Sequence, residues 1–136
     1  MVAMNHHHPP RLAASLLALC VAGFALAPVA SAEQMYPDVI AVKARERPAN
    51  TFEFDVTVSS PYDTPQRYAD GIRAMAKDGA VLGQRKLFHD HASEQPFTRS
   101  LRVVLIPAAV RVAVIQARDS KYGYGGKTVE VTLPGR

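Results

Sequence analysis

Two histidines separated by one residue, His89 and His91, form the pair in this sequence best suited to binding a metal ion. If a β-strand runs through them, side chains at i and i+2 point to the same face, and the two imidazoles could chelate one ion. Glu94, Asp90 or Asp119 could add a carboxylate. Imidazole and carboxylate ligands without thiolate suit Zn(II), Cu(II) or Ni(II). One hypothesis is therefore a zinc or copper site that uses His89, His91 and Glu94.

The same two histidines also have a simpler interpretation. An H-x-H pattern arises by chance, and its spacing fixes no third ligand. Both residues could be partly exposed loop histidines held by hydrogen bonds, or an imidazole could have a catalytic or pH-sensing role. The sequence leaves these alternatives open.

A second group of residues suits the binding of a protein or a small ligand: Tyr62, Glu94, Arg99, Tyr122 and Tyr124. Glu94 and Arg99 could direct a carboxylate and a guanidinium at a ligand. Alternatively, Arg99 pairs with Glu94 while Phe97 enters the core, since charge pairs between strands are common. The YGYGG segment at 122–126 predicts either a tyrosine binding surface or a plain connection in which glycine supplies positive φ. Asp119 and Ser120 could brace that turn through side chain to backbone hydrogen bonds.

Motifs for catalysis are few. Ser100 or Ser120 could combine with a histidine and Asp119, but the sequence has no G-x-S-x-G nucleophile motif. It also has no phosphate-binding glycine loop and no H-E-x-x-H. We therefore expect a binding protein and not an enzyme.

Alternation of apolar and polar residues predicts that these side chains are carried by short β-strands. Seven strands are expected, at 39–45, 51–59, 68–76, 81–88, 97–105, 110–118 and 127–133. Such a series predicts an all-β fold, a single antiparallel β-sandwich that is fibronectin/immunoglobulin-like. The tryptophan and the paired cysteines of antibody domains are absent from the sequence, so the fibronectin variant fits better.

Residues 64–77 allow two interpretations. A helix cap at 63–65, followed by apolar residues at helical spacing, would favour a helix. Gly71 opposes it, because glycine costs a helix interior about 1 kcal/mol. Asp78-Gly79 is a strong hairpin signal between two strands. We favour the hairpin.

An up-and-down order of strands places alternate loops at the same end of a sandwich. The loops at 59–67, 89–96 and 119–126 would then lie together, and they hold both histidines of the mature chain. Loops on a rigid scaffold are where binding usually resides. We therefore expect a binding module that uses this end of the domain.

The first 32 residues have the pattern of a secretory signal peptide. One basic residue, Arg11, precedes an apolar run at 12–30, and a small-residue site follows at 30–32. This pattern predicts cleavage after Ala32, a domain at residues 33–136 and export, with the periplasm as the expected compartment. A membrane anchor is the alternative, since the run approaches the ~20 residues of a spanning helix. Pro28 and the cleavage site end the run, so we expect no membrane attachment after cleavage.

Composition agrees with one exported globular domain. The chain has 136 residues, 48% of them hydrophobic and 21% charged. The net charge of +4 falls to +3 once Arg11 leaves with the signal peptide. Basic and acidic residues alternate along the sequence, so we expect no nucleic-acid partner, which would need a basic stripe. The single cysteine, Cys20, also leaves, which excludes a disulfide within the mature chain.

Three segments together resemble a known group of proteins: HDHASEQPFTRSL at 89–101, IPAAV at 106–110 and ARDSKYGYGGKTVEVTLP at 117–134. The pattern H-x-H…EQPFTRSL…DS…GYGG is similar to that of small secreted proteobacterial proteins. The resemblance covers about the last two-thirds of the mature chain. It implies a β-sandwich, with a hairpin at the Asp-Gly segment, and it implies no activity.

Overall fold

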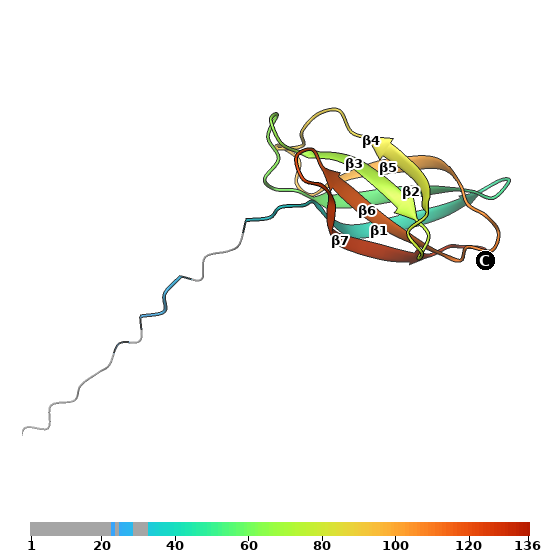
Figure 1. Ribbon diagram of the computed structural model, residues 1–136, viewed down its shortest axis with the longest axis horizontal. Helices are drawn as coiled ribbons and strands as arrows, with labels where there is room; N and C mark the ends of the chain where they lie inside the picture. Colours follow the sequence, from blue (N-terminus) through green and yellow to red (C-terminus); the bar gives the residue numbers. More distant parts are fainter. Residues whose placement is uncertain (1–22, 24, 29–32) are drawn as a thin grey trace, which may run out of the picture. The chain divides into compact units, whose positions relative to one another are not determined.

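The computed structural model describes residue 23, residues 25–28 and residues 33–136 (Figure 1). The cleavage site expected after Ala32, and most of the signal peptide expected at 1–32, lie outside the described residues. The folded domain falls within one unit, Ala32–Arg136. A search of the described positions finds no helix with the length and apolar character that crossing a bilayer requires.

Seven strands pair into two antiparallel sheets (Figure 1). They are β1 (Asp38–Arg47), β2 (Thr51–Ser59), β3 (Ala69–Met75), β4 (Val81–Lys86), β5 (Phe97–Leu105), β6 (Val112–Asp119) and β7 (Gly123–Thr132). One sheet has the order β1-β2-β5 and the other the order β4-β3-β6-β7. The predicted antiparallel β-sandwich is confirmed. Since β4 joins the sheet of β3, the partition differs from a constant immunoglobulin domain, whose fourth strand lies in the other sheet.

The core lies between the two sheets, and β2 shows how the sequence builds it. Its alternating side chains are fully buried: Phe52, Phe54, Val56 and Val58. They belong to one apolar cluster with Ile72 of β3 and Ile115 of β6. Each buried side chain of this size stabilises the fold by about 1.5–3 kcal/mol. The polar residues between them face outward, which is the pattern of a half-buried antiparallel strand.

The middle of the chain is a hairpin and not a helix. β3 and β4 pair in antiparallel register, with Ile72 opposite Arg85. The connecting turn is closed by Ala76, whose N–H donates to the carbonyl of Ala80 (2.8 Å). Asp78 adds a side-chain hydrogen bond to the Ala80 N–H (2.9 Å). The sequence preference for the Asp-Gly turn is therefore confirmed.

Several strand boundaries differ from the prediction, and three of them move candidate site residues: the ends of β4 and β6, which now includes Asp119, and the start of β7. β4 ends at Lys86, which pairs with Gly71, and does not reach residue 88; one further backbone hydrogen bond joins the N–H of Leu87 to the carbonyl of Asp70 (2.8 Å). His89 and His91 are consequently not on a continued strand. β7 begins at Gly123 and not at 127, so Tyr124 belongs to a strand, not to a loop.

The expected clustering of three loops at one end is confirmed. The connections β2–β3, β4–β5 and β6–β7 are joined by side-chain hydrogen bonds. Tyr62 donates to Asp119 (2.7 Å), and the backbone N–H of His91 donates to Asp63 (3.0 Å). The first bond joins the β2–β3 connection to the last residue of β6, and the second joins two connections, so this end of the sandwich is held as one unit.

A β-bulge interrupts β5 at Val103. Between the pairs Phe52–Val104 and Phe54–Leu101, two residues of β5 stand opposite one residue of β2. Val103 has φ of 56° and an 80% exposed side chain. A β-branched residue in the left-handed region is a genuine outlier. Bulges re-aim neighbouring side chains, and Arg102 is the neighbour here.

We expect the substitution Val103→Asn to raise the free energy of unfolding by about 1 kcal/mol, because asparagine tolerates the left-handed conformation better than valine does. Little apolar burial is lost, since Val103 is exposed. Urea unfolding measures the change. Leu105→Asn, at an exposed β5 position outside the positive-φ region, is the matched control and should destabilise. A loss in both variants would show that the bulge stores no strain.

Candidate functional site

His91 is buried against the core. Its ring stacks on Phe97 with centroids 3.9 Å apart and an interplanar angle of 12°. Its side chain is only 4% exposed, and its Nδ1 lies 4.0 Å from Asp63 Oδ2. The pKa of His91 is lowered, because burial disfavours the charged form and because Arg99 and His89 add positive charge nearby. His91 is therefore an imidazole kept neutral near the end of the sandwich.

His89 lies beside His91 but is exposed. The two ring centroids are 5.1 Å apart and the rings are tilted by 43°. His89 Nδ1 lies 3.1 Å from the carbonyl oxygen of Asp90. The structure thus brings together the two imidazoles of the metal hypothesis. Among the described residues, however, no group of three or more His, Cys, Asp or Glu side chains is placed to hold a metal ion.

Glu94 and Arg99 pair with each other, as one interpretation of the sequence predicts. Arg99 Nη2 donates to Glu94 Oε2 at 3.2 Å, and this contact lowers the pKa of Glu94. Phe97, which lies between these two residues in the sequence, is fully buried. Glu94 therefore points to Arg99 in this structure and does not complete the histidine pair.

Tyr62 and Tyr122 both lie against Arg67, and Tyr122 remains 42% exposed. The Arg67 guanidinium carbon lies 4.1 Å from the Tyr62 ring centroid and 4.9 Å from that of Tyr122. Arg67 also donates to the carbonyl of Met35 (2.7 Å), and its Nε lies 3.3 Å from a carboxylate oxygen of Asp119. We name Tyr62, Arg67, Asp119 and Tyr122 the arginine clamp. These contacts have a structural role at the loop end.

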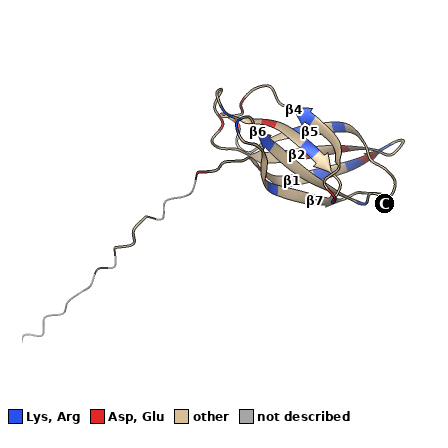
Figure 2. Ribbon diagram, viewed as in Figure 1, with Lys and Arg blue, Asp and Glu red and all other residues tan. Residues whose placement is uncertain are grey.

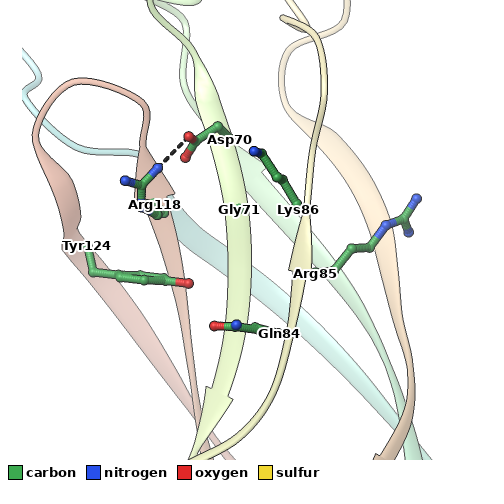
Figure 3. A pocket seen from close by; sticks show the side chains of 7 residues that line it. All are labelled: Asp70, Gly71, Gln84, Arg85, Lys86, Arg118 and Tyr124. Carbon is green, nitrogen blue, oxygen red and sulfur yellow. Dashed lines mark hydrogen bonds and ion pairs between the residues drawn. The ribbon is translucent and has the colours of Figure 1, made fainter.

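Tyr124 lies instead on the outer face of the four-stranded sheet. It stands opposite Arg118 of β6, and the Arg73 guanidinium carbon sits 3.6 Å from its ring centroid. In Figure 3 Tyr124 and Gln84 extend toward each other across the strand that carries Gly71. Gly71 has no side chain, so a hollow of about 330 Å³ remains there. We name it the sheet cavity; its lining residues are Asp70, Gly71, Gln84, Arg85, Lys86, Arg118 and Tyr124.

Two further cavities adjoin β4. β4 and β5 are the last strands of their sheets, and Arg85 spans them by donating to the carbonyl of Ser100. The seam cavity, about 610 Å³, lies here and is lined by Gln84, Arg85, Thr98, Arg99, Ser100, Leu101 and Arg102. The histidine cavity, about 100 Å³, is lined by Arg85, Lys86, Leu87, Phe88, His89, His91 and Arg99. Arg85 thus borders all three cavities.

Positive charge dominates these linings. The three cavities together expose five basic residues: Arg85, Lys86, Arg99, Arg102 and Arg118. We name these five the cationic side, and Figure 2 marks the basic residues at the end of β4. Asp70 is the one acidic lining residue, and it is bonded to Arg118 (Figure 3). No carboxylate within 4 Å of Arg85 or Lys86 is found among the described residues.

Sequence reasoning found part of this surface. It selected Arg99 and Tyr124, which line cavities, and both histidines. It missed Arg85, Lys86, Arg102 and Arg118, because it treated basic residues as scattered along the chain. The alternation in β4 carried a usable signal, because neighbouring side chains of a strand point to opposite sides. In Figure 3 the Lys86 side chain extends toward Asp70, whereas Arg85 contributes to the sheet cavity with its near end and extends the other way.

Comparison with known proteins adds no relative. No protein-family model, curated protein or solved structure matches this chain. Function must therefore be inferred from the site itself.

Proposed function

We propose that this chain is a secreted, non-catalytic binding module that takes an anionic ligand along its cationic side. The observation that carries the proposal is that Arg85 borders all three cavities, whose linings hold five arginine and lysine residues and one acidic residue. Clefts lined by one sign of charge concentrate the field and attract ligands of the opposite sign. Export through a signal peptide at 1–32 is part of the same proposal.

The chemistry of the cavities favours binding over catalysis. Ser120 Oγ accepts a hydrogen bond from the N–H of Tyr68, and Ser100 Oγ donates to Asp55. Within the described residues, neither hydroxyl is hydrogen-bonded to an imidazole. Side chains that bind and orient an anion are present, since arginine donates in a planar fork that matches carboxylate, phosphate and sulfate groups. Tyr124 and Gln84 add an aromatic ring and an amide beside them (Figure 3).

A sulfated polymer is the simplest probe of this surface. We expect residues 33–136, which contain all seven strands, to bind dextran sulfate and not uncharged dextran. Binding should weaken as salt rises, because exposed charges are screened over about 10 Å at 0.1 M salt. Biolayer interferometry at several salt concentrations measures both expectations.

Charge reversal locates the surface. The double substitution Arg85→Glu with Lys86→Glu should weaken binding about tenfold or more, given about 1 kcal/mol for each basic residue near an anionic surface. Lys43→Glu with Lys127→Glu, exposed positions on β1 and β7 that line none of the three cavities, is the matched control because it changes the net charge by the same amount. Equal losses in both variants would mean that binding reflects overall charge, and the proposed site would be wrong.

A further inference from the structure

We propose that the histidine cavity is a subsite for one tetrahedral oxyanion, a sulfate or phosphate group carried by the anionic ligand. This inference rests on the proposed function and specifies which group of the ligand is recognised. It is carried by three observations: the size of the cavity, the unused nitrogens of His91 and the charges around them.

The size of the cavity suits a single small group. Its volume of about 100 Å³ is roughly three times the ~30 Å³ that one water molecule occupies in the liquid. One oxyanion with its four oxygens fits, while the rest of a ligand would extend along the seam cavity, since Arg85 and Arg99 line both.

His91 has two ring nitrogens that the folded chain does not use, one a donor and the other an acceptor in the neutral ring. Both ring nitrogens are buried, and neither has a hydrogen-bond partner among the described residues. Buried polar groups are normally satisfied, because leaving one unpaired costs about 1–3 kcal/mol. The backbone around His91 is fully engaged: its N–H donates to Asp63 and its carbonyl accepts from Gln95 and Glu94. His91 lines the histidine cavity, and we infer that a ligand bound there satisfies its unpaired nitrogens.

The surroundings of His91 favour an anion over a metal cation. The basic groups that line its cavity are His89, Arg85, Lys86 and Arg99, whereas the acidic groups near it are Asp63 and Glu94. Both carboxylates are already engaged. Asp63 accepts from the N–H groups of Ala69 and His91, and Glu94 pairs with Arg99. A cation would meet four basic side chains, and an oxyanion would meet four donors.

Binding should become tighter as the pH falls. In the free domain burial and the charges of Arg99 and His89 lower the pKa of His91. A bound dianion offsets those charges and raises the pKa, so a proton is taken up on binding. Sulfate is the suitable probe because it stays a dianion throughout this range. We expect its affinity to rise about tenfold between about pH 7.5 and about pH 5.5.

The test follows the imidazole signals of residues 33–136 by NMR during titration with sodium sulfate. We expect sulfate to shift the His91 ring resonances, more strongly at low pH, and phosphate to do the same, whereas acetate, which is planar and singly charged, has at least a threefold weaker effect. His91→Phe retains an aromatic ring against Phe97 and should abolish the shift that sulfate causes in the remaining His89 ring, which lines the same cavity. His89→Ala and Lys86→Gln change exposed residues, should leave the fold intact and should each weaken sulfate binding severalfold. Lys43→Glu should not change it.

The other possible outcomes distinguish a failure of this inference from a failure of the proposed function. A His91 ring that ignores sulfate while dextran sulfate still binds through Arg85 and Lys86 would overturn the subsite and leave the binding surface. Loss of both responses would overturn both. Acetate binding as tightly as sulfate would overturn the tetrahedral class. Zinc shifting both histidine rings with stoichiometric binding, in the absence of any sulfate response, would restore the metal hypothesis for His89 and His91.

Discussion

Replacing Asp119 with alanine is expected to lower the free energy of unfolding by about 3–5 kcal/mol, the usual loss when one partner of a buried ion pair is removed. The Asp119 side chain is fully buried. It accepts hydrogen bonds from the hydroxyl of Tyr62 and from the backbone N–H groups of Lys121 and Tyr122. It also pairs with Arg67. Alanine leaves all four donors without this acceptor.

The matched control is Asp55→Ala. Asp55 also pairs with an arginine and accepts from a serine hydroxyl, but it lies near the surface with 26% of its side chain exposed. Exposed pairs contribute about 0–1 kcal/mol, so this variant should lose little. Urea unfolding compares the two. If Asp55→Ala is as damaging as Asp119→Ala, the arginine clamp has no special role.

Acid should remove the contribution of Asp119. Burial alone raises the pKa of this carboxyl group, but the donors from Tyr62, Tyr122, Lys121 and Arg67 outweigh it, so the pKa lies below its ordinary value. A carboxylate with a depressed pKa stabilises the fold above its unfolded-state pKa of about 3.9 and loses that contribution as the pH falls through the folded-state value. The stability difference between the wild type and Asp119→Asn should therefore shrink below about pH 4.

Much of this fold follows from local pattern. The alternation around Phe52 and Phe54 predicts a half-buried strand, and Asp78-Gly79 predicts the hairpin turn; both are confirmed. The bracing of the last turn by Asp119 is also predictable, because an Asp side chain commonly bonds the backbone two residues ahead. These features depend on neighbours in the sequence, which the sequence displays directly.

The cationic side could not be predicted in the same way. Lys86, Gly71 and Arg118 are far apart in the sequence and become neighbours because β4, β3 and β6 pair in one particular register. The contacts of the two tyrosines at 62 and 122 depend in the same way on the fold. Both rings lie against Arg67, which the sequence pattern around each tyrosine does not indicate, while their role in binding stays a prediction.

The YGYGG segment yields the second large effect. Gly126 has φ of 77°, and a Cβ atom there would lie 2.3 Å from the carbonyl oxygen of Pro37. Alanine at this position would adopt an unfavourable backbone conformation and would also push away the chain that leads into β1. Gly123 has φ of 83°, but a Cβ atom there meets nothing within 4 Å. Comparing alanine substitutions at the two glycines therefore distinguishes the cost of backbone strain from the cost of a steric clash within one hairpin.

We expect Gly123→Ala to lower the free energy of unfolding by about 1–2 kcal/mol, the cost of a left-handed conformation. Gly126→Ala should lose about 2 kcal/mol more, because a steric conflict with the backbone is added. The additional loss should be local: hydrogen exchange of the Lys127 amide, which donates to Asp38 at 2.8 Å, should accelerate in Gly126→Ala and not in Gly123→Ala. Equal losses, with unchanged exchange at Lys127, would mean that the glycines supply only backbone freedom. A larger loss for Gly126→Ala would instead show that glycine is needed at this position because the segment leading into β1 passes close to β7. That requirement is one of packing and does not involve a ligand.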